Sequence, residues 1–270
     1  MAEVPAGHAP GKARGRGRTV LATIAFFVAL AILLALGTWQ VERLQWKEAL
    51  LADMAARRTA APVPLAEELR RVVPVVEGLV AALPGLPVAV DTFKAGCAAA
   101  ALAAGAVAVN DVSACAFDPE LLDVVAQHKP GYVLMHSLGR PATMQDDPRY
   151  GDVVEDILAF FEEKLAMLAR AGLPEDRVVL DPGIGFGKRT EHNLEILRRL
   201  DRFLVLGRPL YLGISNKSVF GKVLGLTVEQ RGMATAVLSA LSAGRGARIH
   251  RVHDVAGVSA ALRLAAAVAA

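Results

Sequence analysis

Cysteine, aromatic residues and unbalanced charge are all scarce in this sequence of 270 residues. Its two cysteines, Cys97 and Cys115, form no Cys-x-x-Cys pair, which excludes a disulfide-built scaffold and a cysteine zinc site. Aromatic residues make up only 5% of the chain, so its core must be built mainly from alanine, valine and leucine. Hydrophobic residues reach 54%, which excludes a disordered protein and allows a large core.

The small positive charge is confined to the beginning of the sequence. The formal net charge is +3, and residues 1–19 hold one acid against four basic residues, Lys12, Arg14, Arg16 and Arg18. We interpret residues 1–19 as a basic tail on an otherwise neutral chain. A neutral body argues against nucleic acid as a partner, because such binding needs a basic surface.

One long hydrophobic run follows this tail. Residues 20–37 carry no charge, and a helix of that length spans roughly 27 Å, close to the ~30 Å of a bilayer core. The run exceeds the roughly 7–15 apolar residues of a signal peptide, and Trp39 follows where an interfacial aromatic belt would lie. We therefore predict a single-pass transmembrane helix at 20–37, in preference to a cleaved signal or a buried helix, and an amphipathic helix and linker at 38–65.

The residues around this run resemble a known family. The stretch ALGTWQVERLQWKEALLADMAARRTAAPVPL is similar to the N-terminal anchor of the Surfeit family of cytochrome oxidase assembly proteins, and the resemblance covers about residues 18–65. It implies a membrane-anchored assembly protein. The second membrane span of that family has no counterpart, since residues 38–270 contain no second uncharged stretch of this length.

From residue 66 onward, short β-branched runs alternate with helical patterns. Helical spacing covers residues 66–83, and six strands are expected after it, at 87–91, 106–110, 132–136, 178–181, 210–213 and 248–253. This alternation is typical of βαβ units in a parallel sheet. Because a TIM (β/α)8 barrel needs eight strands, we predict an α/β domain at 66–270 that is an incomplete barrel of this type, with about six parallel strands.

Polar residues end five of the six expected strands, namely Asp91, Asn110, His136, Asp181 and His253. Buried parallel strands are apolar along their length, whereas barrel enzymes build their sites from residues at the carboxyl ends of strands. The fourth strand leads into DPGIGFGK at 181–188, whose glycines let the backbone approach a flat or anionic ligand. This segment lacks the residue order of a P-loop, which argues against nucleotide hydrolysis.

Several segments together resemble the dihydropteroate synthase family. They are VDTFKA (90–95), VNDVSA (109–114), LMH (134–136), PATMQ (141–145), DPGIGFGK (181–188), GISNKSVFG (213–221) and RVHDV (251–255). The resemblance covers about residues 66–270 and implies a transferase of folate biosynthesis, EC 2.5.1.15. That family condenses a dihydropterin-methyl pyrophosphate with 4-aminobenzoate and releases pyrophosphate. A homodimer formed through barrel helices is a further implication.

The resemblance also gives a role to individual side chains. A carboxylate can accept two parallel N–H donors of a pterin ring, and the pterin-binding candidates are Asp91, Asn110, Asp181 and Lys217. Fixed positive groups stabilise a departing pyrophosphate, and the candidates are Arg251 and His253, which alternate along the last expected strand. The aminobenzoate candidates are Phe186 and Ser218, and further candidates are Met135, His136, Gly185 and Asn216. No residue is assigned as a base or a nucleophile, because the aniline nitrogen attacks a stabilised cationic methylene.

A purely structural role is the alternative for each of these residues. Asp181 and His136 would then cap strands, Lys217 would be a solvated surface lysine, and the Arg-x-His pair would only support the fold.

Two departures from the family pattern bear on activity. Asn216 stands where the family commonly has an arginine beside the aminobenzoate site. The first two strands of the family, with the asparagine that helps to hold Mg²⁺, have no counterpart, so Mg²⁺ is implied as a cofactor but no ligand is assigned to it. We expect six of eight strands, two open sheet edges, reduced stability, and low or no activity.

Three functions therefore stay open at this point. The chain is a pterin-binding transferase, a membrane assembly factor whose C-terminal part is only carried along, or a non-catalytic barrel remnant that binds pterin or anions. The tail charge favours an N-terminus in the cytoplasm and a barrel outside, whereas the pterin substrate is made in the cytoplasm. This conflict favours a fusion joined near residues 62–68.

Overall fold

The computed structural model describes residues 14–59, 63–140 and 143–269. The chain divides into two compact units, Met1–Pro62 and Val63–Ala270. Most of the expected basic tail, part of the expected linker and proposed junction, and Pro141 and Ala142 of the PATMQ segment lie outside the described residues.

The first unit is one helix, α1 (Arg14–Thr59), of 46 residues. The predicted membrane segment and the amphipathic segment after it therefore lie in one continuous helix, and their boundary at residue 37 stays a prediction. Gly37 alone costs only about 1 kcal/mol in a helix interior, and the Thr38 hydroxyl donates to the carbonyl oxygens of Leu34 and Ala35 at 3.1 and 2.9 Å. No breaker interrupts the ladder, so the helix continues.

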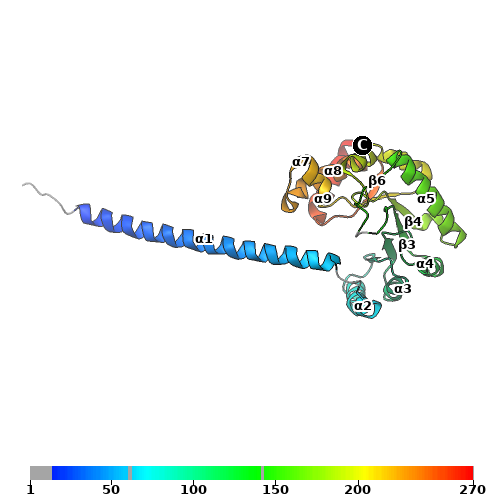
Figure 1. Cartoon of the computed structure of the whole chain (residues 1–270), viewed down its shortest axis with the longest axis horizontal. Helices are drawn as coiled ribbons and strands as arrows, with labels where there is room; N and C mark the ends of the chain where they lie inside the picture. The colour runs from blue at the N-terminus through cyan, green and yellow to red at the C-terminus, as the bar shows by residue number, and fades with distance from the viewer. Residues whose placement is uncertain (1–13, 60–62, 141–142, 270) are drawn as a thin grey trace, which may run out of the picture. The chain divides into compact units, whose positions relative to one another are not determined.

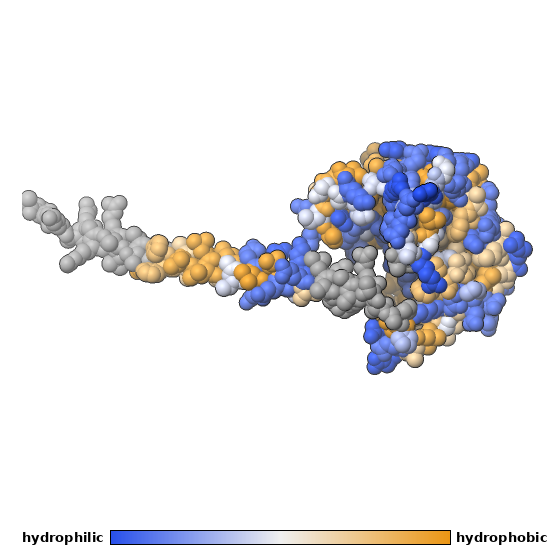
Figure 2. Space-filling view, in the orientation of Figure 1, coloured by the Kyte–Doolittle hydropathy of each residue, from blue (hydrophilic) through white to orange (hydrophobic). Residues whose placement is uncertain are grey.

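Within α1, Phe26–Ala49 is long and apolar enough to cross a membrane by length and composition. This window overlaps the predicted span at 20–37 over residues 26–37. Figure 2 shows the described part of α1 as apolar in its first half and polar toward its end, which fits the predicted order of an apolar segment followed by an amphipathic one.

The second unit contains a sheet of six parallel strands in the order of the sequence. The strands are β1 (Ala89–Asp91), β2 (Ala108–Asp111), β3 (Gly131–Met135), β4 (Val178–Asp181), β5 (Leu210–Leu212) and β6 (Ala247–His250). In the described part of the chain, β1 pairs only with β2 and β6 only with β5, so the sheet is an open half-barrel. The predicted fold class is confirmed.

Helices cover the outer face of this sheet (Figure 1). They are α2 (Leu65–Ala82), α3 (Ala95–Ala103), α4 (Leu121–His128), α5 (Val153–Arg170), α6 (Thr190–Arg198), α7 (Ser218–Leu224), α8 (Arg231–Ala243) and α9 (Val255–Ala269). Short 3-10 helices lie at Glu175–Arg177, Leu200–Leu206 and Val228–Gln230. Each strand is followed by at least one helix, which is the connection that parallel pairing requires.

The core lies between the strands and these helices. Val109, Leu134, Leu180 and Leu212 come from neighbouring strands and are fully buried. Phe161 of α5 contacts Phe203 with ring centroids 5.8 Å apart, so two of the few aromatic residues close the space between helices. Strand residues that face the helices are thus apolar, and polar residues gather after the strands end.

The last strand is shorter than the sequence predicts. β6 ends at His250, so Arg251 and His253 lie in the loop after it and do not alternate along a strand. The Arg251 amide still donates to the carbonyl oxygen of Leu212 at 3.0 Å, but the His253 amide donates to the Ser215 hydroxyl instead. The backbone hydrogen bonds of the sheet end here, because the His253 amide donates to the Ser215 side chain and not to a backbone carbonyl oxygen.

Asp111 is a fully buried carboxylate at the end of β2 that organises the following turn. It accepts hydrogen bonds from the amides of Ser113 and Cys115 at 2.8 and 2.6 Å. The Tyr132 hydroxyl of β3 also donates to it at 2.8 Å. Burial, together with the charge of Asp111, raises the pKa of Tyr132, which therefore stays a neutral donor.

We expect Tyr132→Phe to destabilise the protein by about 1–3 kcal/mol, because one donor to a buried carboxylate is lost. Urea unfolding of the full chain measures this change. Tyr211→Phe is the matched control, since its hydroxyl makes no hydrogen bond to the described residues. Equal stability of the two variants would contradict the role of Asp111.

Candidate active site

The carboxyl ends of the first and last strands are joined by an ion pair. The Arg251 guanidinium lies 2.8 Å from Asp91 Oδ2, and both side chains are about half exposed. Asn110 Nδ2 donates to the same oxygen at 3.0 Å. Asn110 lies directly opposite Asp91 in the pairing of β1 with β2, which allows this contact. These three predicted residues therefore meet across the open side of the sheet.

Asp181 ends β4 and is 5% exposed. Its Oδ1 accepts the amide of Gly183 at 2.8 Å. Burial raises the pKa of Asp181 to about 6, although the Gly183 amide and the charges of Lys217, Lys188 and Arg251 act to lower it. Asp181 thus shares one electrostatic environment with two of the predicted cations.

Lys217 follows β5 and lies over the glycine-rich loop. Its ammonium is 4.1 Å from the centre of the Phe186 ring, and a Cβ on Gly185 would be 3.4 Å from its Cδ. Burial lowers the pKa of Lys217, while Asp181 acts to raise it. A lysine held by a ring and a nearby carboxylate is not a freely solvated side chain.

His253 contacts the loop that follows β5. Its Nδ1 is 2.8 Å from the Ser215 hydroxyl and 3.4 Å from Asn216 Nδ2. Asn216 has a positive φ of 58°, and its carbonyl oxygen accepts from Arg231 Nη1 at 2.7 Å. Asparagine tolerates this left-handed backbone, so Arg231 and Asn216 fix the loop that bears Lys217.

Ser218 directly follows Lys217 in the chain, and its surroundings differ from those of the strand-end candidates. It begins α7 and lines a cavity of about 660 Å³ together with Gln145, Asp147, Pro148, Lys188, Arg189, Thr190, Asn193, Val219 and Lys222. Phe186, the other aminobenzoate candidate, contacts Lys217 instead. The two candidates are linked through Lys217, which lies over the Phe186 ring and directly precedes Ser218.

His136 and Met135 are buried and not exposed at a ligand surface. The His136 ring packs edge-on against Phe160 of α5, with centroids 4.9 Å apart. Burial and the charge of Lys188 lower the pKa of His136 to about 3, so its ring is neutral. The structural alternative therefore describes the His136 side chain better than a direct ligand contact.

Sequence reasoning missed Lys188, the last residue of DPGIGFGK. It is 3% exposed, and its ammonium is 2.9 Å from His136 Nδ1 and 3.0 Å from the carbonyl oxygen of Phe186. The segment was interpreted through its glycines, which do adopt positive φ at 183, 185 and 187. The signal that could have identified Lys188 is its position as a charged residue directly after the glycine-rich loop.

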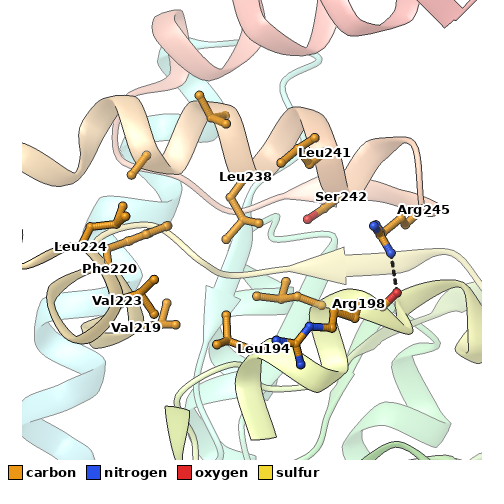
Figure 3. Close-up of a pocket in the computed structure, with 13 residues that line it drawn as sticks. Leu194, Arg198, Val219, Phe220, Val223, Leu224, Leu238, Leu241, Ser242 and Arg245 are labelled. Atoms are coloured by element: carbon orange, nitrogen blue, oxygen red, sulfur yellow. Dashed lines mark hydrogen bonds between the residues drawn. The ribbon is translucent and has the colours of Figure 1, made fainter. Parts of the chain in front are cut away.

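An apolar pocket of about 360 Å³ lies elsewhere, between α6, α7 and α8 (Figure 3). Its labelled lining is mainly aliphatic, with Phe220, and with Arg198 and Arg245 at one end, where Arg245 donates to the Arg198 carbonyl oxygen. None of the strand-end candidates lines it. Because the pocket offers no carboxylate and no strand-end residue, it is not the active-site candidate.

Comparison with known proteins decides the family. The sequence matches the family described as pterin binding enzyme over residues 47–253. The chain belongs to this family of pterin-binding enzymes. It is 38% identical to dihydropteroate synthase of Synechocystis sp., over 81% of this chain and 75% of that protein. The resemblance to dihydropteroate synthases is confirmed.

Solved structures of pterin-binding enzymes share the fold. Dihydropteroate synthase of Stenotrophomonas maltophilia has a TM-score of 0.75 at 42% identity, over 78% of this chain and 79% of that one. The enzyme of Xanthomonas albilineans in complex with 7,8-dihydropteroate has a TM-score of 0.72 at 41% identity, over 80% and 81%. The family match begins at residue 47, inside the segment that resembles the Surfeit anchor.

We expect Gly183→Ala to disrupt the glycine loop, because an added Cβ would lie 2.0 Å from the carbonyl oxygen of His136. Gly207→Ala is the matched control. The φ of Gly207 is +66°, close to the +68° of Gly183, but no other atom would lie within 4 Å of its added Cβ. The control should lose only the ~1–2 kcal/mol of stability that an alanine costs in the left-handed backbone conformation. Urea unfolding of both variants measures the difference, and equal losses would contradict the predicted clash.

Proposed function

We propose that this chain acts as a dihydropteroate synthase, condensing a dihydropterin-methyl pyrophosphate with 4-aminobenzoate. One observation carries the proposal. A buried carboxylate, Asp181, lies in the field of Lys217 and Arg251 at the carboxyl rim of a half-barrel that matches the fold of dihydropteroate synthases. Carboxyl-terminal rims are where barrel enzymes hold their substrates.

The rim offers acceptors and donors that suit a pterin ring. Asp181 Oδ2 is available to accept a ring N–H or the amino group, because Oδ1 already holds Gly183. Asn110 Oδ1 is buried and has no partner among the described residues, so a second ligand N–H would satisfy it. Lys217 supplies a donor for the oxo group or a ring nitrogen.

The leaving group needs positive charge as its C–O bond breaks. Arg251 supplies a guanidinium that is 56% exposed and so remains accessible while paired with Asp91. His253 is held by Ser215 at the same rim and adds a donor. The amine of aminobenzoate then attacks the electron-poor methylene and loses its proton to solvent, so no buried base is needed.

Aminobenzoate binding is the weakest part of this site. Phe186 offers a ring beside Lys217, and Ser218 offers a hydroxyl at the start of α7. Asn216 provides an amide where the family commonly has a guanidinium, so no fixed charge pairs with the carboxylate at that position. We infer weaker binding of aminobenzoate than of pterin.

Magnesium remains a family-based proposal. Among the described residues, no group of three or more His, Cys, Asp or Glu side chains could hold a metal ion. A protein-only cage therefore does not fit this site. Mg²⁺ often keeps several waters and binds substrate phosphates with only one or two carboxylates, so any Mg²⁺ would depend mainly on the pyrophosphate.

We further propose that α1 anchors the chain in a membrane and that α8 and α9 pair two copies. The apolar window Phe26–Ala49 supports the anchor. Exposed apolar side chains support the homodimer, namely Met233, Val237, Leu241, Leu264 and Val268. The Surfeit-type assembly function gains no support from the comparisons, and the side of the membrane that bears the barrel stays open between the charge pattern and the substrate chemistry.

We expect the full chain in detergent micelles to bind 6-hydroxymethylpterin in a titration calorimeter, with affinity falling as the pH drops through about 6. Below that pH, Asp181, whose pKa is raised to about 6, gains a proton and loses its acceptor role. Asp181→Asn should weaken binding at least about tenfold at neutral pH, whereas Asp176→Asn on an exposed 3-10 helix should not. Undetectable binding by the wild-type chain at millimolar pterin would contradict the pterin site.

Pyrophosphate release from the full chain, with both substrates and Mg²⁺, tests catalysis itself. We expect turnover well below that of the Stenotrophomonas maltophilia enzyme assayed in parallel, because two sheet edges are open in the described structure and Asn216 lacks a guanidinium. Binding without turnover would favour the non-catalytic remnant. Turnover equal to that enzyme would contradict the expected impairment.

A further inference from the structure

Lys188 is a buried cation without a carboxylate partner in direct contact. Its ammonium uses three acceptors, His136 Nδ1 at 2.9 Å, the carbonyl oxygen of Phe186 at 3.0 Å and that of His136 at 3.3 Å. An ammonium has three donors and no acceptor, so His136 Nδ1 must accept and the ring proton must be on Nε2. No described carboxylate forms a salt bridge with Lys188.

These three contacts join two loops of the rim. The His136 carbonyl belongs to the end of β3, and the Phe186 carbonyl belongs to the glycine-rich loop after β4. Between them lies Gly183, where a Cβ would be 3.4 Å from the Lys188 ammonium. Gly183 is also the residue whose amide binds Asp181, so Lys188 supports the turn that fixes this carboxylate.

Burying an ammonium without a directly paired carboxylate is costly, and only its hydrogen bonds and nearby negative charge offset this cost. Burial lowers the pKa of Lys188 to about 7, whereas Asp181 acts to raise it. The reciprocal influence favours the charged form of Asp181. Asp181 also faces Lys217 and Arg251, and Lys188 also faces Lys217 and the neutral ring of His136.

We propose that Lys188 is a positioning residue of the pterin site, whose ammonium holds the glycine loop against the end of β3 and places a positive charge beside the turn that binds Asp181. The inference rests on the proposed function and deepens it. The three donors of Lys188 are already used within the protein, so we assign it no direct hydrogen bond to the substrates. Its effect reaches the pterin through Gly183 and Asp181.

The first test measures Asp181 without any ligand. Carboxyl ¹³C shifts of aspartate-labelled full chain, followed across pH 4–9, report its titration. In Lys188→Met and Lys188→Gln the Asp181 midpoint should move upward by about half a pH unit or more, because a nearby positive charge is lost. Lys188→Arg keeps the charge and should keep the midpoint, and Lys129→Met, at an exposed lysine after α4, is the control for loss of a lysine elsewhere.

The second test measures binding of 6-hydroxymethylpterin by calorimetry over the same pH range. The uncharged variants should bind about threefold to tenfold more weakly near pH 6–7 and approach the wild type near pH 9, where Asp181 is ionised in all of them. A purely structural lysine would instead weaken binding by one factor at every pH. If Lys188→Met fails to fold by circular dichroism, the glutamine and arginine variants decide.

The outcomes separate the two claims. An unchanged Asp181 midpoint, or a loss of affinity independent of pH, would overturn the role of Lys188 even if pterin binds normally. Absence of pterin binding by the wild-type chain would overturn the proposed function, and with it any pterin role for Lys188. A shifted midpoint with a pH-dependent loss of affinity would support both.

Discussion

Every candidate side chain of this protein depends on one constraint, the parallel pairing of six strands. Because all six run the same way, their carboxyl ends meet at one rim. Asp91 lies opposite Asn110, and Met135 lies opposite Asp181 in the same ladder. Polar residues that are far apart along the chain are thereby placed together without any motif linking them.

This rim concentrates charge that the interior would otherwise exclude. Asp181 and Lys188 are both buried. Burial raises the pKa of Asp181 and lowers that of Lys188, so it favours the neutral form of each side chain. They lie close enough for each charge to support the other, and Lys217 and Arg251 extend the positive region toward solvent. A carboxylate surrounded by cations suits a ligand with N–H donors on one side and phosphates on the other.

The open sheet makes the rim incomplete. In the described residues, β1 and β6 each leave one edge unpaired, and the Arg251–Asp91 ion pair links their ends. An exposed pair of this kind adds little stability, so it cannot replace the hydrogen bonds of missing strands. The same two residues are candidates for binding the proposed substrates, so the open edges bear on the proposed function as well as on stability.

By itself, the sequence determined the βαβ alternation, the half-barrel and the strand-end residues, because apolar periodicity and polar strand ends are local signals. It misplaced Arg251 and His253 on a strand, since the hydrogen bond from the His253 amide to the Ser215 hydroxyl that decides this strand end is not visible in a pattern. It also missed Lys188. Only the tertiary structure shows that its ammonium is buried between two loops, because those loops meet through strand pairing and not through proximity in the chain.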